Sequence, residues 1–179
     1  MQTNQAWPNQ QESGNKLPGR QRLEWEQKIK SGANWFYWIA ALSVVNSILI
    51  ITGSEWSFIV GLGITQIVDG IAWGISQETG NTILPYIAFG LNLGIAGLFA
   101  LFGYMANQKK GWAFGVGMGL YAIDALIFLL VMDFLSIGFH VFALICIYSG
   151  YKAYKEFSEA PIQRTVFVNQ QKEFSGMPQ

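Results

Sequence analysis

The sequence predicts an all-α fold, a polytopic transmembrane helical bundle of about five helices. Charged side chains gather at the ends of the chain: residues 1–32 hold eight, residues 152–179 hold seven, and the 119 residues between them hold only seven. That middle region contains no arginine and cannot build the charged surface that a water-soluble domain needs. About 20 apolar residues span a bilayer as a helix, and the middle region contains five runs of about that length.

Three regions follow from this distribution of charge. Residues 1–32 are predicted to form a polar N-terminal tail, residues 33–151 the transmembrane bundle, and residues 152–179 a polar, flexible C-terminal tail. Within the first region, residues 22–30 place apolar side chains on one helical face beside basic residues. This pattern favours a short helix at the membrane surface, and a solvated tail is the alternative.

The five apolar runs are the expected membrane helices. Aromatic residues gather near their ends, as they do at membrane interfaces, and the breaks between the runs are rich in turn-forming residues. The last break is very short, so the last two helices are predicted to form a tight antiparallel hairpin. The runs are Trp35–Ile51, Trp56–Ile75, Ile83–Met105, Trp112–Met132 and Phe134–Tyr151.

The number of crossings decides the orientation. The basic N-terminal tail predicts a cytoplasmic N-terminus by the positive-inside rule. Five crossings would then place Lys109 and Lys152 outside, whereas four crossings, with the second run failing to cross, would place every basic cluster inside. We favour five, because the second run is long enough to span and irregular backbone does not face lipid. A polytopic chain without a visible signal peptide suggests a bacterial inner (plasma) membrane.

An internal similarity supports five helices. The second run contains FIVGLGITQIVDG and the fourth contains FGVGMGLYAIDA, so both follow a shared F-x-V-G-x-G pattern and end near an aspartate. The match predicts two related helical hairpins followed by a fifth helix. Chance similarity between glycine-rich apolar helices is the alternative.

Glycines four residues apart occur in several runs, most clearly at Gly111, Gly115 and Gly119. Small residues at this spacing let helix backbones approach closely in lipid. They are typical of packing within any compact bundle. The alternative is a homo-oligomer that forms through this face.

Asp69 and Asp124 each fall near the middle of an apolar run. A central aspartate costs about 2.5–3.5 kcal/mol on insertion scales, so each carboxyl group must point into the bundle and find a partner or a proton. Gln66 and Tyr121 each lie three residues earlier on the same helical face and are the expected hydrogen-bond partners. Asn46 and Asn92 supply further amide partners.

Helical geometry predicts a pair between Asp124 and His140. If the last two helices fold back at Asp133, these residues lie at similar depths, about 14 Å and 10 Å from the turn. The pair would keep Asp124 ionised and raise the proton affinity of the histidine, while Asp133 would cap the fifth helix. The pair is a structural clamp, or a proton or ligand site. A metal site is disfavoured because the chain has one histidine and one distant cysteine.

Three segments, GANWFYWIAALSVVNS, FIVGLGITQIVDG and GWAFGVGMGLYAIDALIFLLVMDFLSIGFHVFAL, are similar to a group of uncharacterised bacterial multi-pass membrane proteins. The resemblance covers about Gly32 to Lys152. It implies a membrane location and no particular activity. The residues that match the pattern of the group are Tyr121, Asp124, Asp133, Phe139 and His140.

Three functions remain open from the sequence. The first is a non-enzymatic scaffold or accessory subunit in the lipid bilayer, and the second is a small transporter or proton-conducting protein that uses Asp69, Asp124 and His140. The third, an intramembrane enzyme, is weakest because neither G-x-S-x-G nor H-E-x-x-H occurs. A net charge of zero makes nucleic acid an unsuitable partner, and no cofactor motif is visible. If Asp69, Asp124 and His140 meet in a water-accessible pocket, the transporter is favoured. If each is enclosed by neighbouring side chains, the scaffold is favoured.

Overall fold

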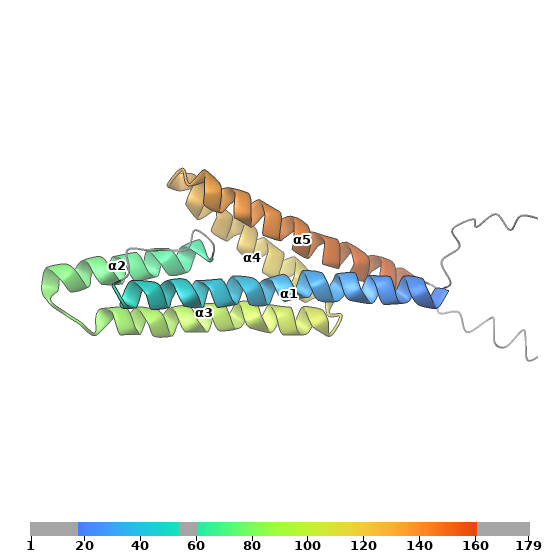
Figure 1. Ribbon diagram of the computed structural model, residues 1–179, viewed down its shortest axis with the longest axis horizontal. Coiled ribbons are helices and arrows are strands. Elements are labelled where there is room, and N and C mark those ends of the chain that lie inside the picture. Colours follow the sequence, from blue (N-terminus) through green and yellow to red (C-terminus); the bar gives the residue numbers. More distant parts are fainter. Residues whose placement is uncertain (1–17, 54–60, 161–179) are drawn as a thin grey trace, which may run out of the picture.

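The computed structural model describes residues 18–53 and 61–160, and these residues form five α-helices and no strand (Figure 1). The predicted all-α bundle is therefore confirmed. Four of the helices, all except α2, are long and apolar enough to cross a membrane. The helices are α1 Pro18–Ile51, α2 Gly63–Thr79, α3 Leu84–Asn107, α4 Gly111–Leu130 and α5 Phe134–Glu159.

Helix α1 is longer than its apolar run. Its 34 residues correspond to about 50 Å at 1.5 Å per residue, and residues 22–30 form its first turns and not a separate surface helix. Ile29 and Ala33 are fully buried, so this part of α1 already belongs to the packed core. Helix α5 likewise extends to Glu159, eight residues beyond the expected end of the bundle. Residues 1–17 and 161–179 of the two predicted tails lie outside the described residues.

Close glycine contacts hold the long helices together. A Cβ atom at Gly150 on α5 would lie 2.8 Å from the Cα atom of Gly32 on α1, so the two backbones touch at this crossing. Gly117 on α4 instead makes room for a side chain of α1, because a Cβ atom there would lie 2.6 Å from the Phe36 ring. Glycines thus stand at the positions where neighbouring helices come closest, as is common for helices that pack in lipid.

Helix α2 runs in the same direction as α1, which contradicts the preferred topology of five crossings. Leu62 contacts Ser43, and Trp73, eleven residues after Leu62, lies beside Gly53, ten residues after Ser43, so positions advance together along both helices. Helix α2 therefore begins beside the last third of α1 and continues past the C-terminal end of α1 (Figure 1). At 17 residues, or about 25 Å, it is also shorter than the roughly 30 Å hydrocarbon core. Four helices of the structure are long and apolar enough to cross a membrane, and α2, with 17 residues, is shorter than these four.

The prediction of two related hairpins is also wrong. Helices α3 and α4 are antiparallel neighbours joined by a tight turn, whereas α1 and α2 are parallel. The shared glycine pattern adopts different structures in the two places. Gly61 and Leu62 precede α2, but the matching Gly117 lies inside α4. Residues 54–60, which include the start of the second run at Trp56, lie outside the described residues.

The antiparallel hairpin of α4 and α5 forms as predicted. Met132, with φ of 55°, ends α4: its N–H donates to the Leu129 carbonyl and the next N–H, of Asp133, donates to the Phe128 carbonyl. This pair of bonds satisfies the last carbonyls of the helix. In Figure 1 the hairpin lies at an angle to the α1–α3 pair, and the two pairs diverge toward the end of α1. Helix α2 occupies this divergence, in contact with α1, α3 and α4.

All the basic residues in the described part of the chain lie at one end of the bundle. The first turns of α1 meet the end of α5 and the α3–α4 turn there, because Lys109 pairs with Glu26 at 2.5 Å and Arg22 lies over the Phe157 ring. Figure 1 shows the start of α1 and the end of α5 together at this end. The described basic residues are Arg20, Arg22, Lys28, Lys30, Lys109, Lys110, Lys152 and Lys155.

Large apolar side chains cover the outside of the helices. Ile123, Leu126 and Leu129 on α4 are each more than half exposed, and α3 and α5 present similar faces. Exposed apolar surface of this extent is unfavourable in water and suits the hydrocarbon of a bilayer. The four long apolar helices and this surface fit a membrane protein.

Candidate functional site

Polar side chains meet in the interior of the bundle, beside helix α2. Each has a relative exposure of 6% or less. We call this set the central polar network: Ser43, Asn46 and Ser47 from α1, Thr65 and Asp69 from α2, Asn92 from α3, Asp124 from α4, and Ser136 and His140 from α5.

Asp124 caps the N-terminus of α2 from a different helix. Its Oδ2 atom accepts a hydrogen bond from the Gly63 N–H at 2.7 Å, and its Oδ1 atom accepts one from the Ile64 N–H at 2.9 Å. The first N–H groups of any helix lack partners within the helix, and the helix dipole makes that end attractive to an anion. Asp124 therefore satisfies two amides at the start of α2, the buried Gly63 N–H and the partly buried Ile64 N–H.

Asp124 also contacts His140, as the depth argument predicted. The His140 Nε2 atom lies 3.1 Å from Asp124 Oδ2, and its Nδ1 atom lies 2.8 Å from the carbonyl oxygen of Ser136. A carbonyl only accepts hydrogen bonds, so Nδ1 carries a proton. A second proton is then shared between Nε2 and Oδ2.

Tyr121 packs against this pair and does not bond it. Its ring stacks on the His140 ring at a centroid distance of 4.3 Å and an angle of 18°. The hydroxyl group is buried and has no hydrogen-bond partner among the described residues, so the expected bond from Tyr121 to Asp124 is absent there. Phe128 covers another side of the imidazole at 4.9 Å. His140 is thus enclosed by rings as well as by its two polar partners.

Asp69 lies further along α2, five residues or about 8 Å beyond Ile64. The Ser47 hydroxyl donates to its Oδ2 atom at 2.6 Å, and the Asn92 amide lies within hydrogen-bonding reach. Gln66, the partner expected from the sequence, makes no such bond, and its buried Nε2 atom has no partner among the described residues. The carboxyl group is held by neighbouring helices and not by its own.

Asn92 and Ser43 tie the start of α2 to its neighbours. The Asn92 Nδ2 atom donates to Ser47 Oγ at 3.0 Å and to the Thr65 carbonyl at 3.1 Å. The Leu62 N–H donates to Ser43 Oγ at 2.9 Å. Asn46 lies beside Gly61, where a Cβ atom would come within 3.0 Å of the amide nitrogen.

Asp133 lies at the edge of the network, where it contacts Ser136, and caps α5. Its Oδ1 atom accepts the N–H bonds of Leu135 and Ser136, and its Oδ2 atom accepts the Ser136 hydroxyl at 2.5 Å. The hydrogen bond from the Ser136 side chain, followed by the backbone bonds, lowers the pKa of Asp133 below its ordinary value. The expected role as a helix cap is confirmed.

The structure brings some predicted site residues together and separates others. Asp124, His140 and Tyr121 form one group and Asp69 and Asn92 another, joined through the first turn of α2. The sequence analysis missed the hydroxyl groups of Ser43, Ser47 and Thr65 and the amides of α2. Serine and threonine are common in membrane helices, and a helix start inside an apolar run leaves no compositional signal.

No group of three or more His, Cys, Asp or Glu side chains in residues 18–53 and 61–160 is arranged to hold a metal ion.

The three glycines predicted to form an oligomer contact have different surroundings. Gly111 is packed against the Tyr154 ring, whereas Gly115 and Gly119 face open space. Gly115 and Gly119 are therefore the two glycines of this face that a helix of another molecule could contact.

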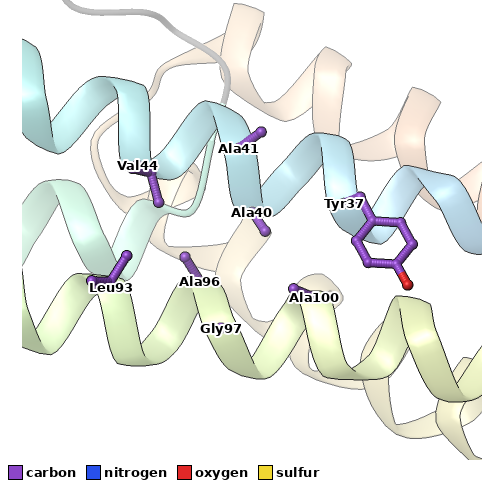
Figure 2. Close-up of a pocket in the computed structure, with 8 residues that line it drawn as sticks. All are labelled: Tyr37, Ala40, Ala41, Val44, Leu93, Ala96, Gly97 and Ala100. Carbon is purple, nitrogen blue, oxygen red and sulfur yellow. The ribbon is translucent and has the colours of Figure 1, made fainter.

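The cavities beside the helices include two whose linings consist of described residues. The first, about 580 Å³, is a groove between α1 and α3 (Figure 2). The second, about 210 Å³, lies where the end of α1 meets α2 and α3 and includes Trp73 and Tyr86. Neither is lined by Asp69, Asp124 or His140. The groove is lined by Tyr37, Ala40, Ala41, Val44, Leu93, Ala96, Gly97 and Ala100.

Comparison with known proteins adds no identity to this geometry. The chain matches no family model, and no curated protein or solved structure is significantly similar to it. The resemblance to bacterial multi-pass proteins stays a prediction, and the membrane bundle with its central polar network is what the structure itself establishes.

Proposed function

We propose that this protein is a non-enzymatic scaffold or accessory subunit of a membrane assembly. The observation that supports it is that both buried carboxyl groups pack against partners from neighbouring helices. Asp124 is satisfied by His140 and two amides, Asp69 contacts Ser47 and Asn92, and neither carboxyl group lines a described cavity. Groups arranged in this way hold helices together, and they present no reactive face to a substrate.

The network has a structural task to perform, because α2 is too short to be held by lipid alone. A helix that starts inside a membrane protein needs partners for its first N–H groups, since each unsatisfied group in hydrocarbon costs several kcal/mol. Asp124 and Ser43 supply these partners from two different helices. The polar residues thereby fix α2 between the α1–α3 pair and the α4–α5 hairpin.

The α1–α3 groove is the surface on which we place a partner. It faces the bilayer, and four alanines and one glycine form most of its wall, as Figure 2 shows. Small side chains allow another transmembrane helix to approach the backbone closely, where packing drives association in lipid. The exposed Gly115 and Gly119 on α4 offer a second such face, and a homo-oligomer through them belongs to the same proposal.

The orientation follows from the basic end of the bundle. With four crossings, every described lysine and arginine falls on one side, and the positive-inside rule places that side in the cytoplasm. The N-terminus and the end of α5 would both be cytoplasmic. A bacterial inner membrane is the location we propose.

The test is ion flux in proteoliposomes. Full-length protein would be reconstituted with an internal pH-sensitive or Na⁺-sensitive dye, and an H⁺ or Na⁺ gradient and a membrane potential would be imposed. A scaffold gives the same flux as protein-free liposomes. Flux that exceeds this background, and that falls in Asp124→Asn or Asp69→Asn but not in the exposed-site control Glu78→Gln, would overturn the proposal and establish the transporter.

One observation favours proton conduction as a second candidate. Asp124 and His140 share a proton at the buried start of a half-length helix, and the Tyr121 hydroxyl beside them has no described partner. Half-length helices with buried N-termini occur at the ion sites of transporters. In the flux assay, this candidate predicts a proton current that is lost in His140→Ala.

A further inference from the structure

We propose that Asp69, Ser47 and Asn92 form a binding site for a single monovalent cation, either a proton or Na⁺. This site is separate from the Asp124–His140 pair. It goes beyond the proposed scaffold, because a bound cation requires no transport and leaves the flux assay unchanged.

The first argument is the balance of charge. The interior of the described bundle contains two carboxyl groups, Asp69 and Asp124, and a single group able to carry positive charge, His140. His140 is committed to Asp124. An ionised carboxylate without a counter-charge is very costly in a low-dielectric interior, so Asp69 needs a cation that the described side chains do not supply.

Lysines at the basic end are too distant to serve. Ser47, which contacts Asp69, lies 17 residues beyond Lys30 on α1, about 25 Å along the helix. Asn92, on the other side of Asp69, lies 17 residues before Lys109. The chain contains no lysine, arginine or histidine between Lys30 and Lys109.

The second argument is an unpartnered oxygen at the same place. Asn92 is 2% exposed, and both of its described hydrogen bonds are made by the Nδ2 atom. Its Oδ1 atom has no partner among the described residues. A buried acceptor without a donor is unfavourable, so the site lacks a group or ion that an oxygen can bind.

A proton or Na⁺ resolves both deficits. A proton on Asp69 removes the charge and converts the carboxyl group into a donor for a neighbouring acceptor such as Asn92 Oδ1. Alternatively, the oxygens of Asp69, Ser47, Asn92 and the Thr65 carbonyl are the hard ligands that small cations prefer. Ser47 Oγ, Asn92 Nδ2 and the Thr65 carbonyl are already linked by hydrogen bonds, so these groups are close to one another.

Other titratable groups are remote from Asp69 in the described structure. The helices packed on this part of α2 are α1 and α3, and neither carries Asp, Glu, Lys, Arg or His between residues 31 and 51 or residues 84 and 107. On α2 itself the nearest is Glu78, nine residues away and exposed. From α4 and α5, Asp124 and His140 face the start of α2 and neutralise each other. Gln66, one turn before Asp69, is uncharged.

The experiment is infrared spectroscopy of the full-length protein labelled with [4-¹³C]aspartate, in Na⁺ buffer and in choline buffer at neutral pH. A protonated carboxyl group gives a carbonyl band that a carboxylate lacks. If the ligand is a proton, one such band, equal to one carboxyl group per protein, appears in both buffers and disappears in Asp69→Asn. If the ligand is Na⁺, the band appears only in choline, and Na⁺ raises the thermal midpoint of the wild type but not of Asp69→Asn.

Asp133→Asn is the matched control, because it removes an ionised aspartate outside the network and should leave the band unchanged. A band that persists in Asp69→Asn belongs to another aspartate and counts against the site. The absence of a band in both buffers, together with no stabilisation specific to Na⁺, would overturn the proposal. If Asp69→Asn fails to fold, the wild-type spectra in the two buffers still test the site. The Asn92→Leu variant tests it as well, because it removes the acceptor and should shift the carbonyl band.

Discussion

Asp124 shows at the scale of one residue how a buried carboxylate can organise a membrane bundle. It accepts bonds from two amides of α2 and from His140, and so links three helices. Its contact with His140 could be predicted from depth alone, because both residues can be counted from the turn at Asp133. The amides could not be predicted, since nothing in the sequence marks Gly63 as the start of a helix.

The first prediction concerns this pair. Asp124→Ala leaves His140 and two buried amides without partners, and loss of one member of a buried pair costs about 3–5 kcal/mol. His140→Ala removes the counter-charge and should cost a similar amount. The double variant should lose less than the sum, with a coupling of about 1–3 kcal/mol measured by denaturation in detergent micelles. Additive losses would contradict the pair, and the exposed Glu78→Ala should change stability little.

Asp133 gives a prediction for pH. Because its pKa is lowered in the folded protein, its stabilisation is complete above the ordinary value of 3.8 and is lost as pH falls through the lower folded value. Asp133→Ala should therefore reduce stability by about 1 kcal/mol near neutral pH and have a smaller effect below about pH 4. Thermal midpoints of the two proteins from pH 7 to pH 3 test this. A difference that grows in acid would exclude the capping role.

At the scale of elements, α2 is the feature that sequence patterns misrepresent. Its run is apolar and long, so composition predicts a full crossing, and the similarity to the fourth run strengthens that prediction. The structure starts the helix at Gly63, where a side chain would meet the Phe128 ring. The direction of a short helix depends on tertiary partners such as Asp124 and Ser43, which periodicity does not report. The four long helices and the α4–α5 hairpin, by contrast, follow directly from length and turn residues.

The α1–α5 crossing carries the prediction at this scale. Gly150→Ala places a methyl group 2.8 Å from the Gly32 backbone, which no rotation of a side chain can relieve. The helices must separate, and a loss of about 1–3 kcal/mol is expected. Gly138→Ala, on the same helix in open space, is the matched control and should be neutral or slightly stabilising. Equal thermal midpoints for the two variants would show that the backbones do not touch.

At the scale of the whole molecule, four crossings agree with the distribution of charge and five do not. The sequence analysis contained both solutions and preferred five crossings, because an apolar run long enough to span was weighed above the positions of Lys109 and Lys152. The structure resolves the conflict through the parallel course of α1 and α2, which returns the chain to the same side. Neither the apolar runs nor the distribution of charge identifies the membrane in which the protein lies or its partner.

Cysteine accessibility tests this topology. In a Cys146→Ala background, single cysteines at positions 53, 79, 108 and 134 would be labelled with a membrane-impermeant thiol reagent in intact cells and in opened cells. Four crossings place positions 53, 79 and 134 on one side and position 108 on the other. Five crossings would separate position 53 from position 79, so opposite labelling of these two would contradict the structure.

The bond between Gly63 and Asp124 joins residues 61 positions apart, and this separation constrains how the chain is assembled. When a ribosome has made α2, the carboxylate that must receive its first amide has not yet been synthesised. Until α4 and α5 enter the bilayer, the start of α2 can satisfy its amides only in water or at the headgroups. Helix α2 should therefore reach its final depth last, after the C-terminal hairpin has been translated.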